Sequence, residues 1–118
     1  MGVEVALTDA QVHDRLAQLP GWRHEQGMIR KTFKTDGWPT TLMLVNAIGF
    51  FAEAADHHPD LKVGWGSVEV AVSTHSAGGI TAKDFELARL VEQTALWRPE
   101  AGSAFRGTPK RFVERNTP

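Results

Sequence analysis

The pattern of hydrophobic and polar positions changes period along the chain and divides it into helical and extended segments. The first segment, residues 8–19, carries apolar side chains at helical spacing and ends at Pro20-Gly21. Residues 22–25 and 28–34 follow as two short segments on either side of Gln26-Gly27. Alternation in the longer of the two predicts a β-hairpin.

A second helix is predicted for residues 40–56, with Pro39 in its first turn. Pro59 ends this helix, because the residue before a proline avoids the helical region. The expected core stripe consists of Leu42, Val45, Ile48, Ala52 and Ala55. On another stripe Glu53 and His57 are four residues apart, so we expect them to lie one turn apart on the same face.

Two further strands and a third helix complete the pattern. Residues 61–65 and 67–75 predict strands joined by a glycine-containing turn, and the second strand alternates well. Residues 81–97 predict the third helix, with Thr81 as N-cap and Asp84 closing a capping box. Its expected core stripe consists of Phe85, Ala88, Val91 and Ala95.

The resulting order, α-β-β-α-β-β-α, predicts an α+β fold. We expect a four-stranded antiparallel sheet with three helices packed on one face. Residues 1–97 are predicted to form the domain, and residues 98–118 a C-terminal extension packed on or near it. Phe105 and Phe112 are the side chains expected to pack back on the domain.

Composition and charge narrow the classes of function. The chain has no cysteine, which excludes disulfides and fits a cytoplasmic location. Its first residues, MGVEVALTDAQ, resemble neither a secretory signal nor a myristoylation signal, and no stretch is apolar enough to span a membrane. Residues 1–97 carry 8 Lys/Arg and 12 Asp/Glu, whereas residues 98–118 carry 5 and 2. This balance argues against nucleic acid as a partner, and the basic extension favours a solvated tail over one that touches an acidic partner.

Three of the five histidines, His57, His58 and His75, lie in one short region. Taken singly, each has an ordinary structural explanation at a helix end, in a loop or at a strand end. Adjacent histidines point in different directions, and no HExxH spacing is present, so a metal site is poorly supported. General acid–base chemistry is better supported, because imidazole titrates near neutral pH. Glu53 is expected to orient His57.

The spacing of these residues resembles the signature of the pterin-4a-carbinolamine dehydratase family, also known as the dimerization cofactors of a homeodomain transcription factor. The resemblance covers roughly residues 7–97 and is carried by Glu53, His57, His58, Pro59, Trp65, His75 and Asp84, with the flanking stretches LPGW, VAVSTHSAGGIT and KDFELARLVEQTA. It implies the α+β fold already read from the pattern.

The resemblance also implies a function. Members of the family dehydrate 4a-hydroxytetrahydropterin to quinonoid dihydropterin in tetrahydrobiopterin recycling, without a metal or an organic cofactor. It implies that His57, His58 and His75 surround the pterin, with His57 and His75 as the acid–base pair. Further contacts are expected from Trp22, Pro59, Ser73, Thr74 and Ser76, with Asp84 as structural support.

The resemblance further implies assembly as a homodimer or homotetramer and a functional link to an aromatic amino acid hydroxylase. The alternative function is a protein-interaction or assembly module, such as a transcription coactivator or an assembly chaperone, on the same fold. The three retained histidines favour the enzyme over the module. The extension, residues 98–118, is not explained by the signature.

Overall fold

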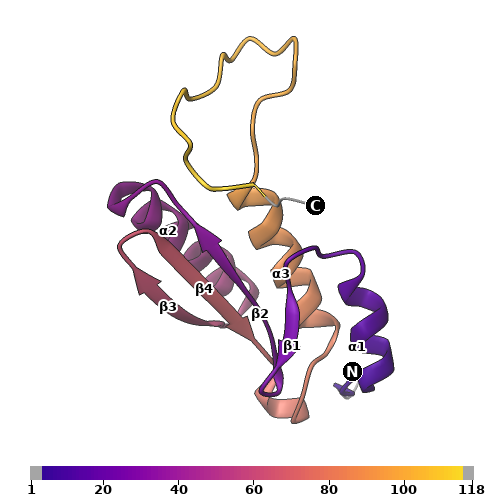
Figure 1. Ribbon diagram of the computed structural model, residues 1–118. Helices are drawn as coiled ribbons and strands as arrows, with labels where there is room; N and C mark the ends of the chain where they lie inside the picture. The colour runs from indigo at the N-terminus through magenta and orange to yellow at the C-terminus, as the bar shows by residue number, and fades with distance from the viewer. Residues whose placement is uncertain (1–3, 116–118) are drawn as a thin grey trace.

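The computed structural model describes residues 4–115, and its order of elements confirms the predicted α+β fold (Figure 1). The elements are α1 (Asp9–Leu16), β1 (Arg23–Glu25), β2 (Met28–Lys34), α2 (Trp38–Ala55), β3 (Asp60–Gly64), β4 (Ser67–Val72), the short 3₁₀ helix η1 (His75–Ala77) and α3 (Ala82–Ala95). Residues 1–3 and 116–118 lie outside the described residues, so the prediction about the start of MGVEVALTDAQ falls partly outside them. Within residues 4–115, no helix is both long and apolar enough to cross a membrane.

The four strands form one antiparallel sheet in the order β1-β2-β4-β3. The two long central strands pair over six residues, from Ile29 opposite Val72 to Lys34 opposite Ser67. Helices α2 and α3 lie behind the sheet, and α1 lies beside β1 (Figure 1). Val12 of α1 joins the same core as the inward side chains of the sheet, so all three helices contribute to one apolar layer.

Strand alternation and the α3 stripe were predicted well. Ile29 and Phe33 of β2 and Val68, Val70 and Val72 of β4 are buried. The predicted α3 stripe, Phe85, Ala88, Val91 and Ala95, is also buried. Burial of these side chains removes apolar surface from contact with water, and this removal drives folding of the domain.

The predicted core stripe of α2 is only half right. Ile48 and Ala52 are buried, but Leu42 is 40% exposed, and Thr41 and Leu44 face the core in its place. The hydroxyl of Thr41 donates to the Trp65 carbonyl at 2.9 Å and lies 2.7 Å from the Thr35 hydroxyl. A buried threonine is tolerated because its hydroxyl is hydrogen-bonded. The polar residue Thr41 therefore lies on the buried face of α2, and polarity alone does not distinguish that face from the exposed one.

The C-terminal extension leaves the end of α3 as a loop and returns to the sheet. Val113 is buried and pairs with Thr35 in an isolated bridge, and the Glu114 N–H donates to the Lys34 carbonyl at 2.8 Å. Phe112 is half-buried, whereas Phe105 is 69% exposed. The prediction that Phe105 packs on the domain is therefore wrong, because the chain is held at Val113 and Phe105 lies in the projecting part. The boundary between a domain and an extension near residue 97 stays a prediction.

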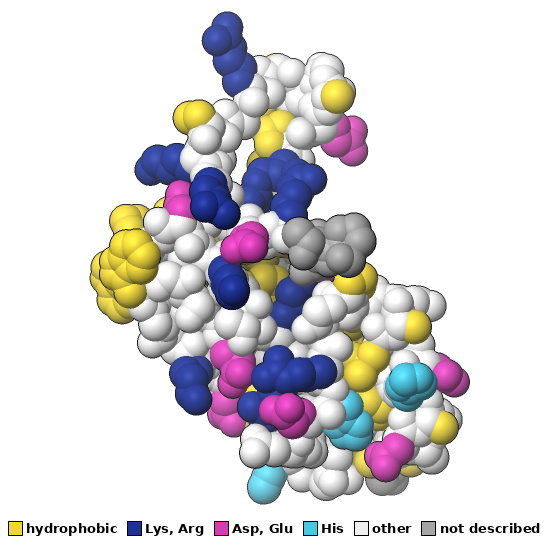
Figure 2. Space-filling model, in the orientation of Figure 1, with side chains coloured by type: hydrophobic (Ala, Val, Ile, Leu, Met, Phe, Trp, Pro, Cys, Tyr) yellow, Lys and Arg dark blue, Asp and Glu magenta, His cyan; other side chains and the backbone are white. Residues whose placement is uncertain are grey.

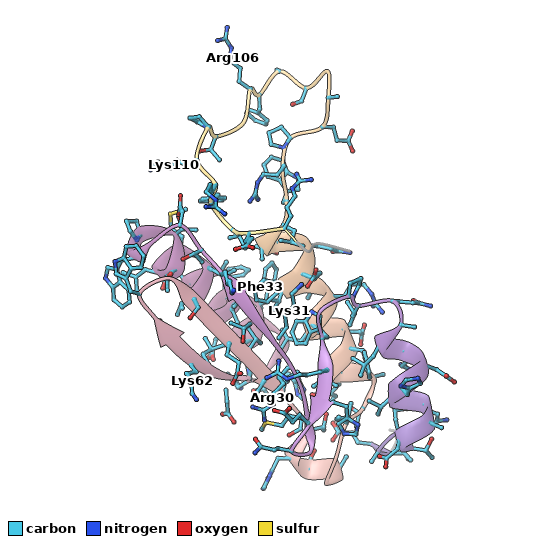
Figure 3. The ribbon with its side chains drawn as sticks, in the orientation of Figure 1. Arg30, Lys31, Phe33, Lys62, Arg106 and Lys110 are labelled. Atoms are coloured by element: carbon cyan, nitrogen blue, oxygen red, sulfur yellow. The ribbon has the colours of Figure 1, made fainter. Side chains whose placement is uncertain are left out.

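A buried ion pair links the sheet to α3. Lys31 points to the core side of β2, and its Nζ lies 2.9 and 3.0 Å from the two carboxylate oxygens of Glu92. The indole N–H of Trp22 donates to the same carboxylate at 2.8 Å. Lys31 also lies 4.8 Å from the centroid of the Phe33 ring (Figure 3). These contacts balance the cost of burying a lysine and a glutamate.

Replacing Glu92 tests this balance. We expect Glu92→Leu to lower the free energy of unfolding by about 3–5 kcal/mol, because Lys31 stays buried without this carboxylate. The double variant Lys31→Met/Glu92→Leu removes both charges and should recover part of the loss. Urea unfolding measures both, with Glu86→Gln on the exposed side of α3 as the control. A double variant as unstable as Glu92→Leu alone would contradict this account.

Candidate active site

The chain turn after α2 positions His57. The helix ends at Ala55, and Asp56 adopts a left-handed conformation with φ of 53°. The Asp56 N–H donates to the carbonyls of Ala52 and Glu53, and the His57 N–H donates to Ala52 at 3.0 Å. This closure turns the chain before His57, so the imidazole leaves the face of the helix and reaches α3.

His57 meets the buried carboxylate of Asp84. Its Nε2 donates to Asp84 Oδ1 at 2.6 Å, and the two side chains are 12% and 0% exposed. Because the carboxylate accepts a hydrogen bond from Nε2–H, the hydrogen of the neutral ring stays on Nε2 and Nδ1 is its accepting nitrogen. The contact therefore fixes both the orientation and the tautomer of His57.

The other carboxylate oxygen of Asp84 holds the end of β4 and the start of α3. Oδ2 accepts from the Thr74 hydroxyl at 2.8 Å and from the Thr81 N–H at 2.8 Å. The Thr81 hydroxyl lies 2.7 Å from that of Thr74. The predicted capping box of Thr81 and Asp84 is present, and Asp84 does more than cap the helix, since it joins three segments.

His75 follows directly after Thr74, on the turn that these bonds hold. The predicted strand ends at Val72 instead of His75, because Thr74 pairs with Gly79 and the chain enters η1. Gly78 closes the turn with φ of 69°, in the left-handed region that glycine adopts without strain. The turn leaves His75 exposed, one residue from the Asp84 contact.

Glu53 contacts His58 and not His57. The Glu53 carboxylate accepts from His58 Nε2 at 2.9 Å, and the two side chains are 85% and 56% exposed. The expectation that Glu53 orients His57 is therefore wrong, because the left-handed residue before His57 removes it from that face. A solvent-exposed pair of this kind holds its partners weakly.

The remaining predicted residues divide into two groups. Pro59, just before β3, and Ser73, just after β4, are half-buried, and Ser76 is exposed on η1. Trp22 lies elsewhere: it is 6% exposed, packs edge-on against Phe33 and bonds to Glu92. Because Glu92 follows Asp84 by eight residues, Trp22 contacts α3 about 12 Å further along its axis.

Glu4 is a charged residue near these groups that the sequence did not indicate. Its carboxylate accepts from the Ser76 hydroxyl and from Lys83 Nζ, and the Leu7 N–H donates to the Ile80 carbonyl at 2.7 Å. The hydrogen bonds from Lys83 and then Ser76 lower the pKa of Glu4, with a smaller electrostatic contribution from His57. Glu4 lies in a segment without periodicity, so no pattern marked it.

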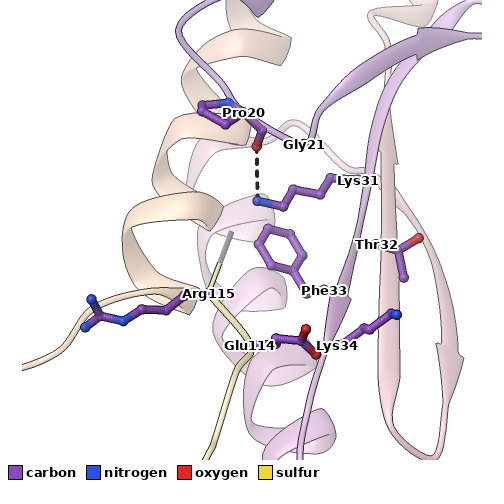
Figure 4. A pocket seen from close by; sticks show the side chains of 8 residues that line it. All are labelled: Pro20, Gly21, Lys31, Thr32, Phe33, Lys34, Glu114 and Arg115. Carbon is purple, nitrogen blue, oxygen red and sulfur yellow. Dashed lines mark hydrogen bonds between the residues drawn. The ribbon is translucent and has the colours of Figure 1, made fainter. Parts of the chain in front are cut away.

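A cavity of about 260 Å³ lies on the opposite part of the fold, between the turn at Pro20 and the middle of β2 (Figure 4). Lys31 donates to the Pro20 carbonyl at 3.2 Å at its edge. None of the predicted site residues lines this cavity. Among residues 4–115, no group of three or more histidine and carboxylate side chains is arranged to hold a metal ion.

Asp84 can be tested through stability. We expect Asp84→Ala to lower the free energy of unfolding by about 3 kcal/mol, because the Thr74 hydroxyl and the Thr81 N–H lose a buried acceptor. Asp84→Asn keeps the size and one oxygen and should lose less. Urea unfolding of both variants measures the difference, and equal losses would contradict this expectation, because asparagine keeps both the size of the side chain and one acceptor oxygen.

Glu4 gives a pH dependence with a defined sign. Its pKa lies below the ordinary value of 4.5, so its contribution to stability is complete above that value and is lost as the pH falls through the folded pKa. We expect Glu4→Gln to be less stable than the parent at about pH 7, and the gap to be smaller at about pH 3, because the pH has then fallen below the unfolded pKa and toward the folded one. Unfolding at both pH values measures this, with Glu100→Gln as an exposed control. A gap of constant size would contradict it.

Comparisons with known proteins agree with the sequence signature. A model of the family described as "Pterin 4 alpha carbinolamine dehydratase" matches residues 5–94. A protein of Roseiflexus castenholzii, named "Putative pterin-4-alpha-carbinolamine dehydratase", is 44% identical over 87 residues, which cover 74% of this chain and 94% of the relative. A protein of the same name from Aquifex aeolicus is also 44% identical, over 74% of this chain and 88% of the relative.

A solved structure agrees as well. The crystal structure of a "transcriptional coactivator/pterin dehydratase" from Brucella melitensis superposes with a TM-score of 0.70 at 30% identity, over 73% of this chain and 94% of the other. The family model, which ends at residue 94, does not match the C-terminal extension. The family model, the matched relatives and the solved structure together confirm the resemblance: the chain belongs to the pterin-4a-carbinolamine dehydratase family.

Proposed function

We propose that the protein dehydrates 4a-hydroxytetrahydropterin to quinonoid dihydropterin and water by histidine general acid–base catalysis, as part of tetrahydrobiopterin recycling. The observation that carries the proposal is the His57–Asp84 contact, with His75 one residue beyond the same anchored network. Loss of water requires a proton to leave N5 of the pterin and a proton to reach the departing hydroxyl. Two imidazoles on either side of the ring can perform these transfers.

The geometry supports His57 as the proton acceptor. Asp84 accepts from Nε2, which leaves Nδ1 to take the proton, and the carboxylate stabilises the imidazolium that results. His75, exposed on η1, is then the donor to the leaving hydroxyl. His58 would hold that hydroxyl, with Glu53 orienting His58.

The other predicted substrate contacts differ in whether their hydrogen-bonding groups already have partners within the protein. The Thr74 hydroxyl donates to Asp84 and its N–H donates to the Gly79 carbonyl, which supports a role for Thr74 in positioning the turn, and its contact with the pterin remains a proposal. Ser73, Ser76 and Pro59 remain proposed substrate contacts. Trp22 is in the core and remains a proposed contact without geometric support.

Several wider features remain proposals. The natural substrate is a small-molecule pterin, and a functional link to an aromatic amino acid hydroxylase would supply it. We also propose assembly as a homodimer or homotetramer in the cytoplasm, without a metal or organic cofactor.

Substitution of the two histidines tests the mechanism. We expect His57→Ala and His75→Ala each to lower kcat/KM for the carbinolamine by about 100-fold or more, since a positioned acid or base contributes about 10²–10⁴ in rate. His13→Ala, on the exposed face of α1, is the matched control. Thermal unfolding of each variant separates lost chemistry from lost structure. Parental turnover in both histidine variants would contradict the mechanism.

A second candidate function is suggested by the name of the Brucella melitensis structure, which includes "transcriptional coactivator". An interaction module on this fold would bind one stoichiometric partner whether or not the histidines are present. Binding that survives His57→Ala/His75→Ala would support this second role. A third possibility, a metal-dependent hydrolase, predicts loss of activity with a chelator, whereas the acid–base mechanism predicts none.

A further inference from the structure

The segment that precedes α1 crosses the turn that carries His75. The Leu7 N–H donates to the Ile80 carbonyl at 2.7 Å, so the two stretches of chain lie side by side. A Cβ at Gly79 would lie 3.2 Å from the Cβ of Ala6, closer than side chains usually approach, so a glycine there permits the contact. In Figure 1 the start of the chain lies beside the connection between η1 and α3. Two separate contacts therefore hold the segment against the turn.

This placement brings Glu4 to both sides of the candidate site. Its carboxylate accepts from the Ser76 hydroxyl, one residue after His75, and from Lys83 Nζ, one residue before Asp84. The Lys83 ammonium contacts Oε1 and the Ser76 hydroxyl contacts Oε2, so the two donors do not compete for one oxygen. The lowered pKa that these bonds cause keeps Glu4 ionised at neutral pH. Glu4 is thus a charged acceptor for two donors beside the site.

Lys83 has a physical reason to bind an acid. It lies in the first turn of α3, where the helix dipole disfavours a positive charge. Glu4 supplies a negative charge there from outside the helix, and its side chain is only 29% exposed. The ion pair therefore holds the carboxylate in place beside Ser76.

Glu4 lies away from the basic side chains of the C-terminal extension. In the space-filling view a histidine side chain projects at the lower end of the molecule, whereas Lys and Arg side chains gather around the projecting extension at the opposite end (Figure 2). The family model begins at residue 5, so membership of the family does not account for Glu4. Its role follows from its own contacts.

The bond to Glu4 decides which hydrogen-bonding role Ser76 can play. A hydroxyl group carries one hydrogen and two acceptor lone pairs. Because the hydrogen points to Glu4, the Ser76 oxygen offers only lone pairs to a ligand. A charged acceptor also polarises the hydroxyl group and strengthens its oxygen as an acceptor. Ser76 is therefore prepared to accept a hydrogen bond from an N–H group.

We propose that Glu4 is a positioning residue that fixes Ser76 as the acceptor for an N–H group of the pterin. The inference rests on the proposed function, in which Ser76 contacts the substrate, and it adds the direction of that hydrogen bond. A pterin ring presents N–H donors at N3, at N8 and at its 2-amino group. Glu4 does not itself touch the ring and acts through Ser76.

A double-variant cycle tests whether Glu4 acts through Ser76. The readouts are the Kd of 7,8-dihydrobiopterin, measured by fluorescence titration, and kcat and KM for the carbinolamine. We expect Glu4→Ala to raise Kd and KM about 3–10-fold, because one hydrogen bond is weakened, and to change kcat by less than about twofold. Ser76→Ala should raise Kd and KM at least as much, and the double variant no more than Ser76→Ala alone.

Additive effects of the two substitutions on Kd would overturn the proposal, because Glu4 would then act independently of Ser76. A loss of kcat in Glu4→Ala that exceeds its effect on KM would also overturn it, since a general structural role would produce that result. Glu100→Ala, at an exposed acid of the extension, is the matched control and should leave both constants unchanged. Thermal unfolding checks that every variant is folded at the assay temperature.

A conservative substitution separates the hydrogen bond from the charge. Glu4→Gln keeps an acceptor oxygen for Ser76 but cannot neutralise Lys83, so its Kd should stay within about twofold of the parent value. A Kd as high as that of Glu4→Ala would overturn the proposal. A parent that binds the dihydropterin without turning over the carbinolamine would contradict the proposed function alone, because the cycle in Kd would still decide the role of Glu4. A parent that binds no dihydropterin would overturn this inference.

Discussion

The burial of the Asp84 carboxylate is the constraint on which the arrangement of the candidate site depends. A carboxylate removed from water must receive hydrogen bonds, or its desolvation would exceed what the fold can offset. Here the donors come from His57, Thr74 and Thr81, which belong to three different segments. Satisfying one acid therefore brings together the loop after α2, the end of β4 and the start of α3. The proposed proton-transfer groups lie on two of those segments.

Helix α3 carries a second buried acid near its other end, and the two have different effects. Asp84 gathers neutral donors and one imidazole, whereas Glu92 neutralises a lysine and receives an indole N–H. Glu92 connects α3 to the middle of β2, and Asp84 connects it to the chain turns at the end of the sheet. Together they set both the position of the helix over the sheet and its rotation about its own axis. The site is thus supported by contacts that lie far from the proposed chemistry.

Much of this could be predicted from the sequence, and the exceptions have physical causes. Alternation in β4 and the capping box of α3 are local patterns, so both were found along with the fold. The face that α2 buries was misjudged because Thr41 is polar by composition but hydrogen-bonded in place. The partner of His57 was misjudged because Asp56 adopts a left-handed conformation that a non-glycine residue seldom takes. Glu4 bonds to Ser76 and Lys83, which are more than 70 residues away in the sequence, and no local pattern predicts such a contact.

The anchoring of the extension has a consequence for how the chain can vary. Arg98 and Val113 close the loop at its base, next to the end of α3 and the end of β2. Changes in the length of the intervening segment would alter neither the sheet register nor the Asp84 network, and loop length affects closure entropy only slowly. The segment between Pro99 and Arg111 is therefore a natural insertion point, where a peptide or a second domain could be grafted without disturbing the rest of the fold.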